Sequence, residues 1–410
     1  MALRGLEVGQ RSETVRRANL SAIVSELHER GPLSRSELVA RTGLTRSAIR
    51  GLIGELVSAD LASEERAAPL GTPGRPSPLV RPNPEGAVVL ALEIAVDSLA
   101  VAIVGLGGRI REIRRVDRPR GHSAVDDVVA DLIELATTVR ARRPHDPLIG
   151  IGVAVVGVVR RNDGLVSMAP NLGWRDVPLG ERLARALDQS APISIANEAD
   201  LGALAELRRG AARGADDIIF ISGEVGVGGG IIVDGTPLTG VAGYGGEVGH
   251  IPVNPDGVAC RCGSVGCWET EVGEGTLLEL AGHPREGGRD AVDAVLLEAA
   301  QGSPLALAAL DHVGRWLGIG LAGLVNVLNP RLIVLGGRFA RLHPFVRRTL
   351  EEELDRRTLP APRALVRVVP ATLGVDAPLL GAAELAFEPL LADPAAWIGS
   401  REPLAVLASA

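Results

Sequence analysis

The stretch GYGGEVGHIPVNPDGVACRCGSVGCWE (residues 243–269) holds every cysteine of the chain. Cys260, Cys262 and Cys267 follow His250, with nine, one and four residues between successive members of the set. Three thiolates and one imidazole are the ligand set of a closed, tetrahedral structural Zn²⁺ site. Three thiols cannot all pair among themselves, so a disulfide framework is disfavoured. The spacing therefore predicts structural zinc, and three buried, inert cysteines beside an ordinary histidine are the alternative.

The composition excludes several classes of protein. The 410 residues suffice for two or three domains, and an aromatic content of 2% requires aliphatic cores. We find no secretory leader and no apolar run long enough to span a bilayer, so we expect a cytoplasmic protein with no membrane partner. The net charge of −7 argues against nucleic-acid binding over the whole surface. Residues 1–85 nevertheless hold 12 Arg against 10 Asp and Glu, a net of +2, which leaves −9 for the remainder.

The first sixty residues predict three helices. Apolar residues between positions 14 and 30 recur at helical spacing, and a Gly-Pro pair ends that helix. Ser34 and Glu37 form a capping box for a second helix, which ends at Gly43. Two short helices joined by a glycine turn, after a longer helix, are typical of a helix-turn-helix. Thr45 caps the third helix, whose inner stripe consists of Ile49, Leu52, Ile53 and Leu56.

The third helix and the segment after it carry the predicted DNA contacts. Polar side chains gather at its N-terminus, where a recognition helix meets base edges and phosphates. Residues 61–81 predict a wing, two extended pieces around a tip whose Gly-Arg-Pro sequence resembles a minor-groove hook. A small helical interaction module, with Arg75 as a solvated loop arginine, is the alternative. The predicted DNA-binding residues are Arg35, Thr45, Arg46, Ser47, Arg50 and Arg75.

An alternation of strand and helix patterns follows the linker at residues 82–86. The pattern runs through one set of strands and helices and then begins again, which predicts an α/β protein with two lobes. The predicted strands are residues 87–93, 99–104, 109–116, 148–156, 192–195, 218–222, 229–233 and 332–335, and the predicted helices are residues 124–140, 179–187 and 305–328.

The cysteine-rich stretch resembles the signature of the ROK family, which comprises sugar kinases and sugar-responsive repressors. The family pattern Gly-Glu-x-Gly-His stands here as GEVGH (residues 246–250). The pattern Cys-x-Cys-Gly-x-x-Gly-Cys-x-Glu stands as CRCGSVGCWE (residues 260–269). The resemblance covers residues 87–392 and implies an actin-like, ribonuclease-H-like pair of lobes closing on a cleft. ROK repressors carry a DNA-binding head, and ROK kinases lack it.

The resemblance also implies a division of the chain and a set of ligands. Residues 1–82 would form a winged helix-turn-helix DNA-binding domain, residues 83–196 the first lobe, residues 197–392 the second lobe with the zinc loop and a closing helix, and residues 393–410 a C-terminal tail. The histidine would bind zinc through one ring nitrogen and face the sugar with the other. The metal ligands would be His250, Cys260, Cys262 and Cys267.

A sugar ring needs convergent carboxylates and amides, because each hydroxyl both donates and accepts a hydrogen bond. The family motifs place such groups in order along this chain. Singly, Glu247 and Asn197 could instead cap helices, and Glu269 could lie on the surface. The sugar-binding residues that the resemblance implies are Asn171, Asn197, Glu198, Glu247, His250 and Glu269.

Three departures from the kinases bear on activity. The kinase general base is an aspartate, and Glu198 here is one methylene longer, while a displacement of about 1 Å can cost roughly 10²-fold in phosphoryl transfer. The first phosphate loop has lost its glycines and contains Asp97, which would face a bound phosphate. The second loop begins with Glu224, another anion beside a would-be polyanion. We therefore expect no ATP cofactor and no catalytic residue.

Two functions from different classes remain. The first is a sugar-responsive regulator, most simply a repressor, that binds operator DNA as a homodimer or dimer of dimers and is released by a carbohydrate effector. The second is an ATP-dependent sugar kinase that acquired a head. The degenerate phosphate loops favour the first. A third interpretation is a constitutive DNA-binding scaffold with a vestigial pocket.

Overall fold

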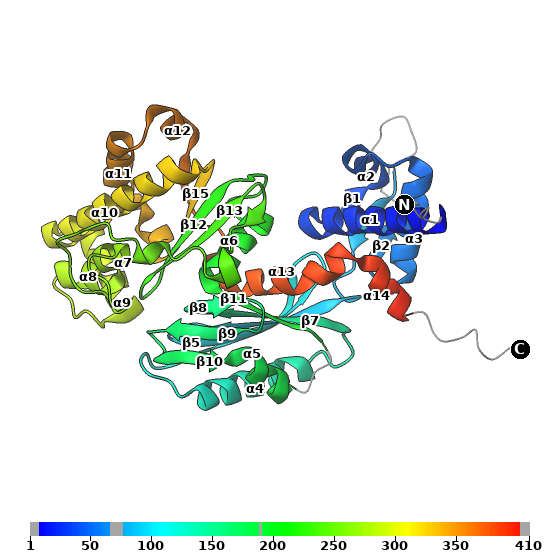
Figure 1. Ribbon diagram of the computed structural model, residues 1–410, viewed down its shortest axis with the longest axis horizontal. Coiled ribbons are helices and arrows are strands. Elements are labelled where there is room, and N and C mark those ends of the chain that lie inside the picture. The colour runs from blue at the N-terminus through cyan, green and yellow to red at the C-terminus, as the bar shows by residue number, and fades with distance from the viewer. Residues whose placement is uncertain (1–7, 66–76, 188–190, 402–410) are drawn as a thin grey trace, which may run out of the picture.

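The computed structural model describes residues 8–65, 77–187 and 191–401 (Figure 1). The described chain forms a small head and two larger α/β lobes, with one long helix running between the head and the lobes. Arg75, which the sequence places at the tip of the wing, lies outside the described residues.

The head is a winged helix-turn-helix, as the sequence predicts. Ser34 Oγ accepts a hydrogen bond from the Glu37 amide at 3.2 Å, and the Glu37 carboxylate accepts one from the Ser34 amide at 2.7 Å, which completes the capping box. Gly43 then ends the second helix with φ +70°, and Thr45 caps the third. The head consists of α1 (Val8–Arg30), β1 (Leu33–Ser34), α2 (Arg35–Thr42), α3 (Arg46–Ser58), β2 (Ala62–Glu65) and β3 (Leu79–Pro82), with the strands in the order β1-β3-β2.

The first lobe is built on a five-stranded sheet in the order β11-β7-β4-β5-β6. Strands β4 and β5 are fully buried aliphatic runs, as expected for strands covered on both faces. A three-stranded sheet, β10-β9-β8, extends the lobe. The elements are β4 (Val88–Ile94), β5 (Ser98–Gly105), β6 (Arg109–Asp117), α4 (Val125–Ala141), β7 (Leu148–Val155), β8 (Val158–Arg160), β9 (Leu165–Ala169), β10 (Trp174–Pro178), α5 (Leu179–Leu187) and β11 (Ile193–Asn197).

The second lobe repeats the plan with a sheet in the order β14-β13-β12-β15-β16. Its core clusters around α10 and the fully buried Trp268. The elements are β12 (Ile218–Gly223), β13 (Val227–Val233), β14 (Thr236–Pro237), η1 (Val241–Gly243), η2 (Val248–His250), α7 (Trp268–Val272), α8 (Glu274–Leu280), α9 (Gly288–Ala300), α10 (Pro304–Leu328), β15 (Leu332–Gly337), α11 (Arg338–Arg357), α12 (Pro360–Leu365), β16 (Arg367–Pro370) and η3 (Gly374–Asp376).

Helices α6 (Glu198–Arg209) and α13 (Ala377–Ala392) lie between the two sheets. The predicted boundary at residue 197 put both in the second lobe, but the contacts distribute them differently. Helix α13 packs on β4 and β7 of the first sheet, where its buried apolar residues cover that face, and α6 packs on β12 and β13. The two helices also pack closely on each other. The closing helix therefore completes the first lobe rather than the second.

Head and body share one hydrophobic core. Leu20, Ile23 and Leu27 of α1 belong to the same buried cluster as Leu385 and Phe387 of α13. The segment expected to be a linker is also packed, because a Cβ on Gly86 would lie 1.6 Å from the Asp60 carbonyl oxygen. The head is thus seated on the body and not merely tethered to it.

The C-terminal tail expected at residues 393–410 begins instead with a helix, α14 (Pro394–Arg401). Helix α14 packs against α1, and its partly buried Trp397 and Ile398 contact the core that head and body share. Arg17 of α1 pairs with Asp393 at the start of this segment. Apolar side chains facing α1 explain why residues 394–401 fold onto the head.

One helix of the described residues, α10, is long and apolar enough by length and composition to cross a membrane. This differs from the expectation that no such run exists. In the fold, α10 is a core helix, because Leu310, Val313, Leu317 and Leu321 are buried beneath α7, α8 and α11.

A helix-interior glycine tests how tightly α6 and α13 pack. A Cβ at position 381 would lie 1.9 Å from the Leu201 carbonyl oxygen, so Gly381→Ala must separate the helices and should cost about 1–3 kcal/mol. At Gly323 of α10 a Cβ would meet nothing within 4 Å, so Gly323→Ala should stabilise the fold by up to about 1 kcal/mol. Thermal unfolding of both variants checks this, and equal shifts would contradict the packing.

Candidate functional site

The side chains of His250, Cys260, Cys262 and Cys267 converge, as the sequence predicts. Their ligand atoms all lie within 4.8 Å of one another. Cys262 Sγ is 3.6 Å from Cys267 Sγ, and Cys260 Sγ is 3.7 Å from His250 Nδ1. Two sulfurs bound at about 2.3 Å to one tetrahedral Zn²⁺ would be roughly 3.8 Å apart. The cluster therefore fits a metal ion of this kind, and the described residues contain no other such group.

The loop that carries the cysteines is fixed to the second lobe on several sides. Gly266 has φ +65°, and a Cβ there would lie 1.6 Å from the Asn254 carbonyl oxygen, so only glycine fits this turn. The Asn254 side chain donates to Glu271 Oε1 at 2.7 Å. Trp268, which follows the last cysteine, donates from Nε1 to the Trp316 carbonyl on α10 at 2.8 Å. A metal ion here would therefore hold the loop against α10.

Three predicted sugar-binding residues surround the metal cluster. His250 Nδ1 lies 3.6 Å from Glu269 Oε1, and Glu247 directly precedes η2, which contains the histidine. Burial raises the pKa of Glu247; the nearby Glu269 carboxylate raises it further, while His250 lowers it. Two carboxyl groups and one imidazole thus converge, and together they offer the mixture of donors and acceptors that sugar hydroxyls need.

The amino end of α6 brings two more predicted residues to the cleft. Asn197 caps the helix, accepting a hydrogen bond from the Ala199 amide at 2.7 Å, and its Nδ2 donates to the Gly157 carbonyl of the first lobe at 2.8 Å. Asn197 therefore caps a helix, which the sequence had left open as an alternative to sugar binding. Burial raises the pKa of Glu198 well above its usual value, and the charge of Glu224 adds to this effect. A protonated carboxyl group at this position can donate as well as accept.

Asn171 lies in the turn between β9 and β10 and meets the zinc loop from the opposite lobe. Its Oδ1 accepts a hydrogen bond from Arg261 Nη1 at 2.9 Å. Sequence reasoning missed Arg261, although its position between two ligand cysteines was a signal. It also missed Asp200, which is 8% exposed and whose Oδ2 lies 3.6 Å from Arg161 Nη2. Burial is the main cause that raises the pKa of Asp200 to about 6. Both residues add charged groups close to predicted sugar-binding residues, Arg261 beside Asn171 and Asp200 beside Glu247.

Ion pairs line the side of the cleft that would face ATP in a kinase. Asp97 pairs with Arg120 at 3.0 Å and with Arg289 at 2.9 Å. Arg120 also binds Glu274 of the second lobe. The Asp97–Arg289 and Arg120–Glu274 pairs cross between the lobes, because Asp97 and Arg120 belong to the first lobe and their partners to the second. The negative charge that the sequence places toward a bound phosphate is therefore balanced by two arginines.

Two further carboxylates in this cavity are similarly constrained. Glu93 is 4% exposed and lies 2.9 Å from Arg115, which also donates to Asp376 at 3.2 Å. Burial raises the pKa of Glu93 to about 7 despite that partner, and burial also raises the pKa of Glu224. Acidic side chains and their arginine partners therefore line this cavity.

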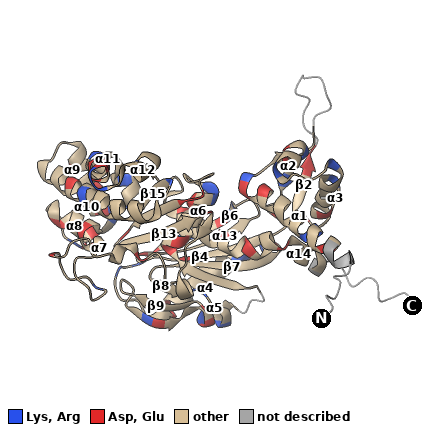
Figure 2. Ribbon diagram, turned by 45° about the horizontal axis from the view of Figure 1, so that its top comes forward, with Lys and Arg blue, Asp and Glu red and all other residues tan. Residues whose placement is uncertain are grey.

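The predicted recognition helix α3 presents its N-terminal side chains to solvent. Thr45, Arg46, Ser47 and Arg50 are exposed, and within the described residues neither arginine forms an ion pair. Figure 2 marks the basic and acidic residues along the ribbon of the head. Thr45 Oγ1 accepts from the Ala48 amide at 3.2 Å and lies 3.0 Å from Ser47 Oγ, which fixes both hydroxyls. Exposed cations at the N-terminus of a recognition helix suit phosphate and base contacts.

Arg35 has a different environment from the other predicted DNA-binding residues. Its guanidinium pairs with Glu64 on wing strand β2, with an Nη2 to Oε2 distance of 2.7 Å. This pair ties the start of α2 to the wing and offsets the charge of Arg35. A contact between Arg35 and DNA stays a prediction, in addition to the ion pair with Glu64.

Comparison with known proteins places the chain in one family. Residues 89–388 match the model of the ROK family. The xylose repressor of Bacillus spizizenii is 30% identical over 382 residues, covering 92% of this chain and 97% of its own length. The glucokinase of Halalkalibacterium halodurans is 33% identical but covers 64% of this chain and 82% of its own. The chain described here belongs to the ROK family.

Solved structures show the same difference in coverage between a regulator and a kinase. A ROK family transcriptional regulator, a homolog of the E. coli MLC protein, has a TM-score of 0.74 and 26% identity and covers 94% of this chain and 97% of its own. A ROK family glucokinase from Streptomyces griseus, in complex with glucose and AMPPNP, has a TM-score of 0.64 and 28% identity and covers 73% of this chain and 99% of its own. The regulator matches nearly the whole chain, and the kinase matches a part shorter by about the length of the head.

The metal cluster predicts one Zn²⁺ per chain, bound by His250 and the three cysteines. Cys262→Ser should lose the metal and lower the melting temperature by about 5 °C or more, because structural zinc contributes folding free energy directly. Elemental analysis and thermal unfolding measure both effects. Val265→Ser is the control: Val265 lies in the same loop, is 49% exposed and is no ligand, so this variant should keep its zinc. Metal-free wild-type protein from a chelator-free purification would contradict the assignment.

The exposed arginines of α3 predict a second outcome. Arg46→Ala/Arg50→Ala should weaken operator binding and reduce the slope of log K against log salt by about two, since each phosphate contact contributes about 0.9. Fluorescence anisotropy over a salt series measures this slope. Arg185→Ala on α5, a 73% exposed arginine of the body, should change neither affinity nor slope. An unchanged slope in the double variant would remove α3 from the DNA interface.

Proposed function

We propose that this protein is a sugar-responsive transcriptional repressor: it binds operator DNA through its winged head and is released by a carbohydrate bound in the cleft. The observation that carries the proposal is the union, in one chain, of a recognition helix with two exposed, unpaired arginines and a cleft where Glu247, His250 and Glu269 converge. The similarity to a xylose repressor over 92% of the chain supports it.

Zinc is the proposed metal of the His250 cluster, with a structural role. Four protein ligands leave no coordination position open for catalysis. The ion would hold the cysteine loop and set the direction of the imidazole, which then presents a fixed ring edge to the effector. Xylose and glucose are the first effectors to test, because related proteins are a xylose repressor and glucokinases.

The head proposed to bind DNA would act in a homodimer, since two heads related by a twofold axis match a palindromic operator. Closure of the cleft moves one lobe relative to the other and would change the spacing of the two heads. Half-sites are separated by fixed helical turns, so a small displacement loses the contacts of one head. Release on sugar binding follows from this geometry.

A sugar kinase with an added head is the second candidate, favoured by the 33% identity to a glucokinase. Two observations weigh against it. Ion pairs of Asp97 with Arg120 and Arg289 occupy the region that ATP phosphates would need. Glu198, in the position of the catalytic base, is one methylene longer than the aspartate of the kinases, and burial together with the nearby Glu224 carboxylate raises its pKa.

Operator affinity with and without sugar tests the proposal. D-xylose or D-glucose at saturation should weaken operator binding by about 5–150-fold. Glu247→Gln and Glu269→Gln should keep operator affinity and lose this response, because they alter the cleft and not the head. The same protein should not turn over ATP with either sugar. Turnover at about 1–10³ s⁻¹ would favour the kinase instead, and equal operator affinities across the sugar panel would favour a constitutive scaffold.

A further inference from the structure

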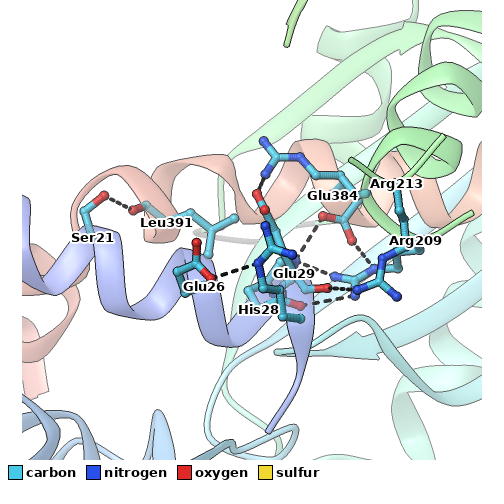
Figure 3. A network of polar contacts seen from close by, with 10 residues as sticks. Ser21, Glu26, His28, Glu29, Arg209, Arg213, Glu384 and Leu391 are labelled. Atoms are coloured by element: carbon cyan, nitrogen blue, oxygen red, sulfur yellow. Dashed lines mark hydrogen bonds and ion pairs between the residues drawn. The ribbon is translucent and has the colours of Figure 1, made fainter. Parts of the chain in front are cut away.

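Helix α6 reaches from the cleft to the head. Its first residue is Glu198, capped by Asn197, and its last two residues are Arg208 and Arg209. Twelve residues of α-helix span about 18 Å. The amino end lies in the cleft, where Glu198 lines a cavity with Glu93 and Asp97, and the carboxyl end meets α1 of the head (Figure 3).

Arg209 joins three elements at the carboxyl end of α6. Its Nε donates to Glu384 Oε1 of α13 at 2.5 Å. Its Nη1 donates to two backbone carbonyls, that of His28 on α1 at 3.2 Å and that of Gly107 in the turn between β5 and β6 at 2.9 Å. Figure 3 shows the guanidinium facing Glu384 and the end of α1 at once. The planar fork of arginine is what permits these bonds simultaneously.

His28 completes the junction in one tautomer. Its Nδ1 accepts a hydrogen bond from the Gly107 amide at 3.0 Å, which assigns the ring proton to Nε2, 3.0 Å from Glu384 Oε2. Arg209 Nη2 lies 2.7 Å from the same Nε2, so the imidazole and the guanidinium share the Glu384 carboxylate. The ring is 0% exposed and stacks at a tilt on Phe387, with centroids 4.8 Å apart. Glu384 thereby receives one bond from the head and one from α6, and it is the shared anchor of both.

A second contact lies beside the first. Arg208 of α6 forms an ion pair with Glu29 of α1, and Arg213, four residues beyond α6, donates to the Glu29 carbonyl at 3.2 Å. The last turn of α1 is therefore held from α6 by side-chain and backbone contacts. His28 and Arg209 are 181 positions apart in the sequence, so only the folded chain brings them into contact.

Helix α6 packs closely on β13 and on α13 near its amino end. A Cβ on Gly230 of β13 would lie 2.5 Å from the Ala199 carbonyl oxygen, and one on Gly381 of α13 would lie 1.9 Å from that of Leu201. Because α6 is closely packed against both β13 and α13, a displacement at its amino end moves the whole helix as a rigid body. A shift of α6 changes the position of Arg209 relative to Glu384 and α1.

We propose that α6 is the element that couples the effector cleft to the DNA-binding head, and that Arg209 is the residue through which the head follows its movement. This inference rests on the proposed function, because it assigns a route to the sugar response. The cleft biases α6 through Asn197 and Glu198, and α6 biases α1 through Arg209. A coupling route requires such an element, one whose position both sites influence.

Arg209→Lys tests the route. Lysine keeps the positive charge beside Glu384 but places its donors on one nitrogen and cannot span both carbonyls. We expect the variant to fold and to bind operator and sugar separately within about threefold of wild type, while the sugar-induced change in operator affinity falls to about twofold or less from the typical 5–150-fold. Fluorescence anisotropy with D-xylose and with D-glucose measures each quantity. Arg182→Lys, on α5 and paired with Asp126, is the control and should respond as wild type does.

The outcomes separate this inference from the proposed function. If wild type shows no response to any sugar, the repressor assignment fails and the inference with it. If wild type responds and Arg209→Lys responds equally, the repressor stands and the route through α6 is overturned. Coupling would then run through the core that α1 and α13 share.

A second variant and a second readout guard against misfolding. Arg209→Gln/Glu384→Gln removes both buried charges together and retains hydrogen-bonding groups, so no uncompensated charge remains. It should also lose the response. If neither variant folds, amide hydrogen exchange on wild type decides the question: sugar should change exchange in the last turn of α1, residues 26–30, and unchanged exchange there would overturn the proposal.

Discussion

The packing of α1 on α13 is the contact on which the arrangement of this protein depends. Leu20, Ile23 and Leu27 of the head share a buried cluster with Leu385 and Phe387 of the body, so the recognition helix has a defined position relative to the cleft. A head on a flexible tether would bind DNA regardless of what the body held. Because α13 also packs on the first sheet and on α6, one helix links the head, the first lobe and the helix that reaches the cleft.

The two sides of the cleft differ in how their charged groups are paired. Around the metal cluster, Glu247, His250 and Glu269 lie close together, and Glu269 Oε1 also accepts a hydrogen bond from Cys260 at 2.9 Å. On the other side, Asp97 is bound by Arg120 and Arg289, so its polar groups are already satisfied. A buried charge is stable only when paired, and pairs across the cleft also hold the two lobes together. This division suits a domain that binds a sugar without transferring phosphate to it.

Local chemistry made part of this structure predictable. Ser34 with Glu37, Thr45 and Gly43 act within one helical turn of their own positions, so the helix-turn-helix follows from short-range rules. The convergence of His250 with the three cysteines was predictable for a similar reason, since cysteine spacing is a local pattern. The position of α13 was not, because an apolar helix carries no mark of which sheet it will cover. Likewise the pairing of Asp97 with Arg289 could not be predicted, because Arg289 is 192 residues away in the sequence.

The central claim is that cleft and head are energetically coupled, and coupling between two binding sites must be reciprocal. Isothermal titration of the effector sugar into the protein, alone and saturated with operator DNA, tests this most directly. The account predicts that operator weakens sugar binding by the same factor by which sugar weakens operator binding. Sugar affinity that is identical with and without operator would contradict it and leave head and cleft as independent sites.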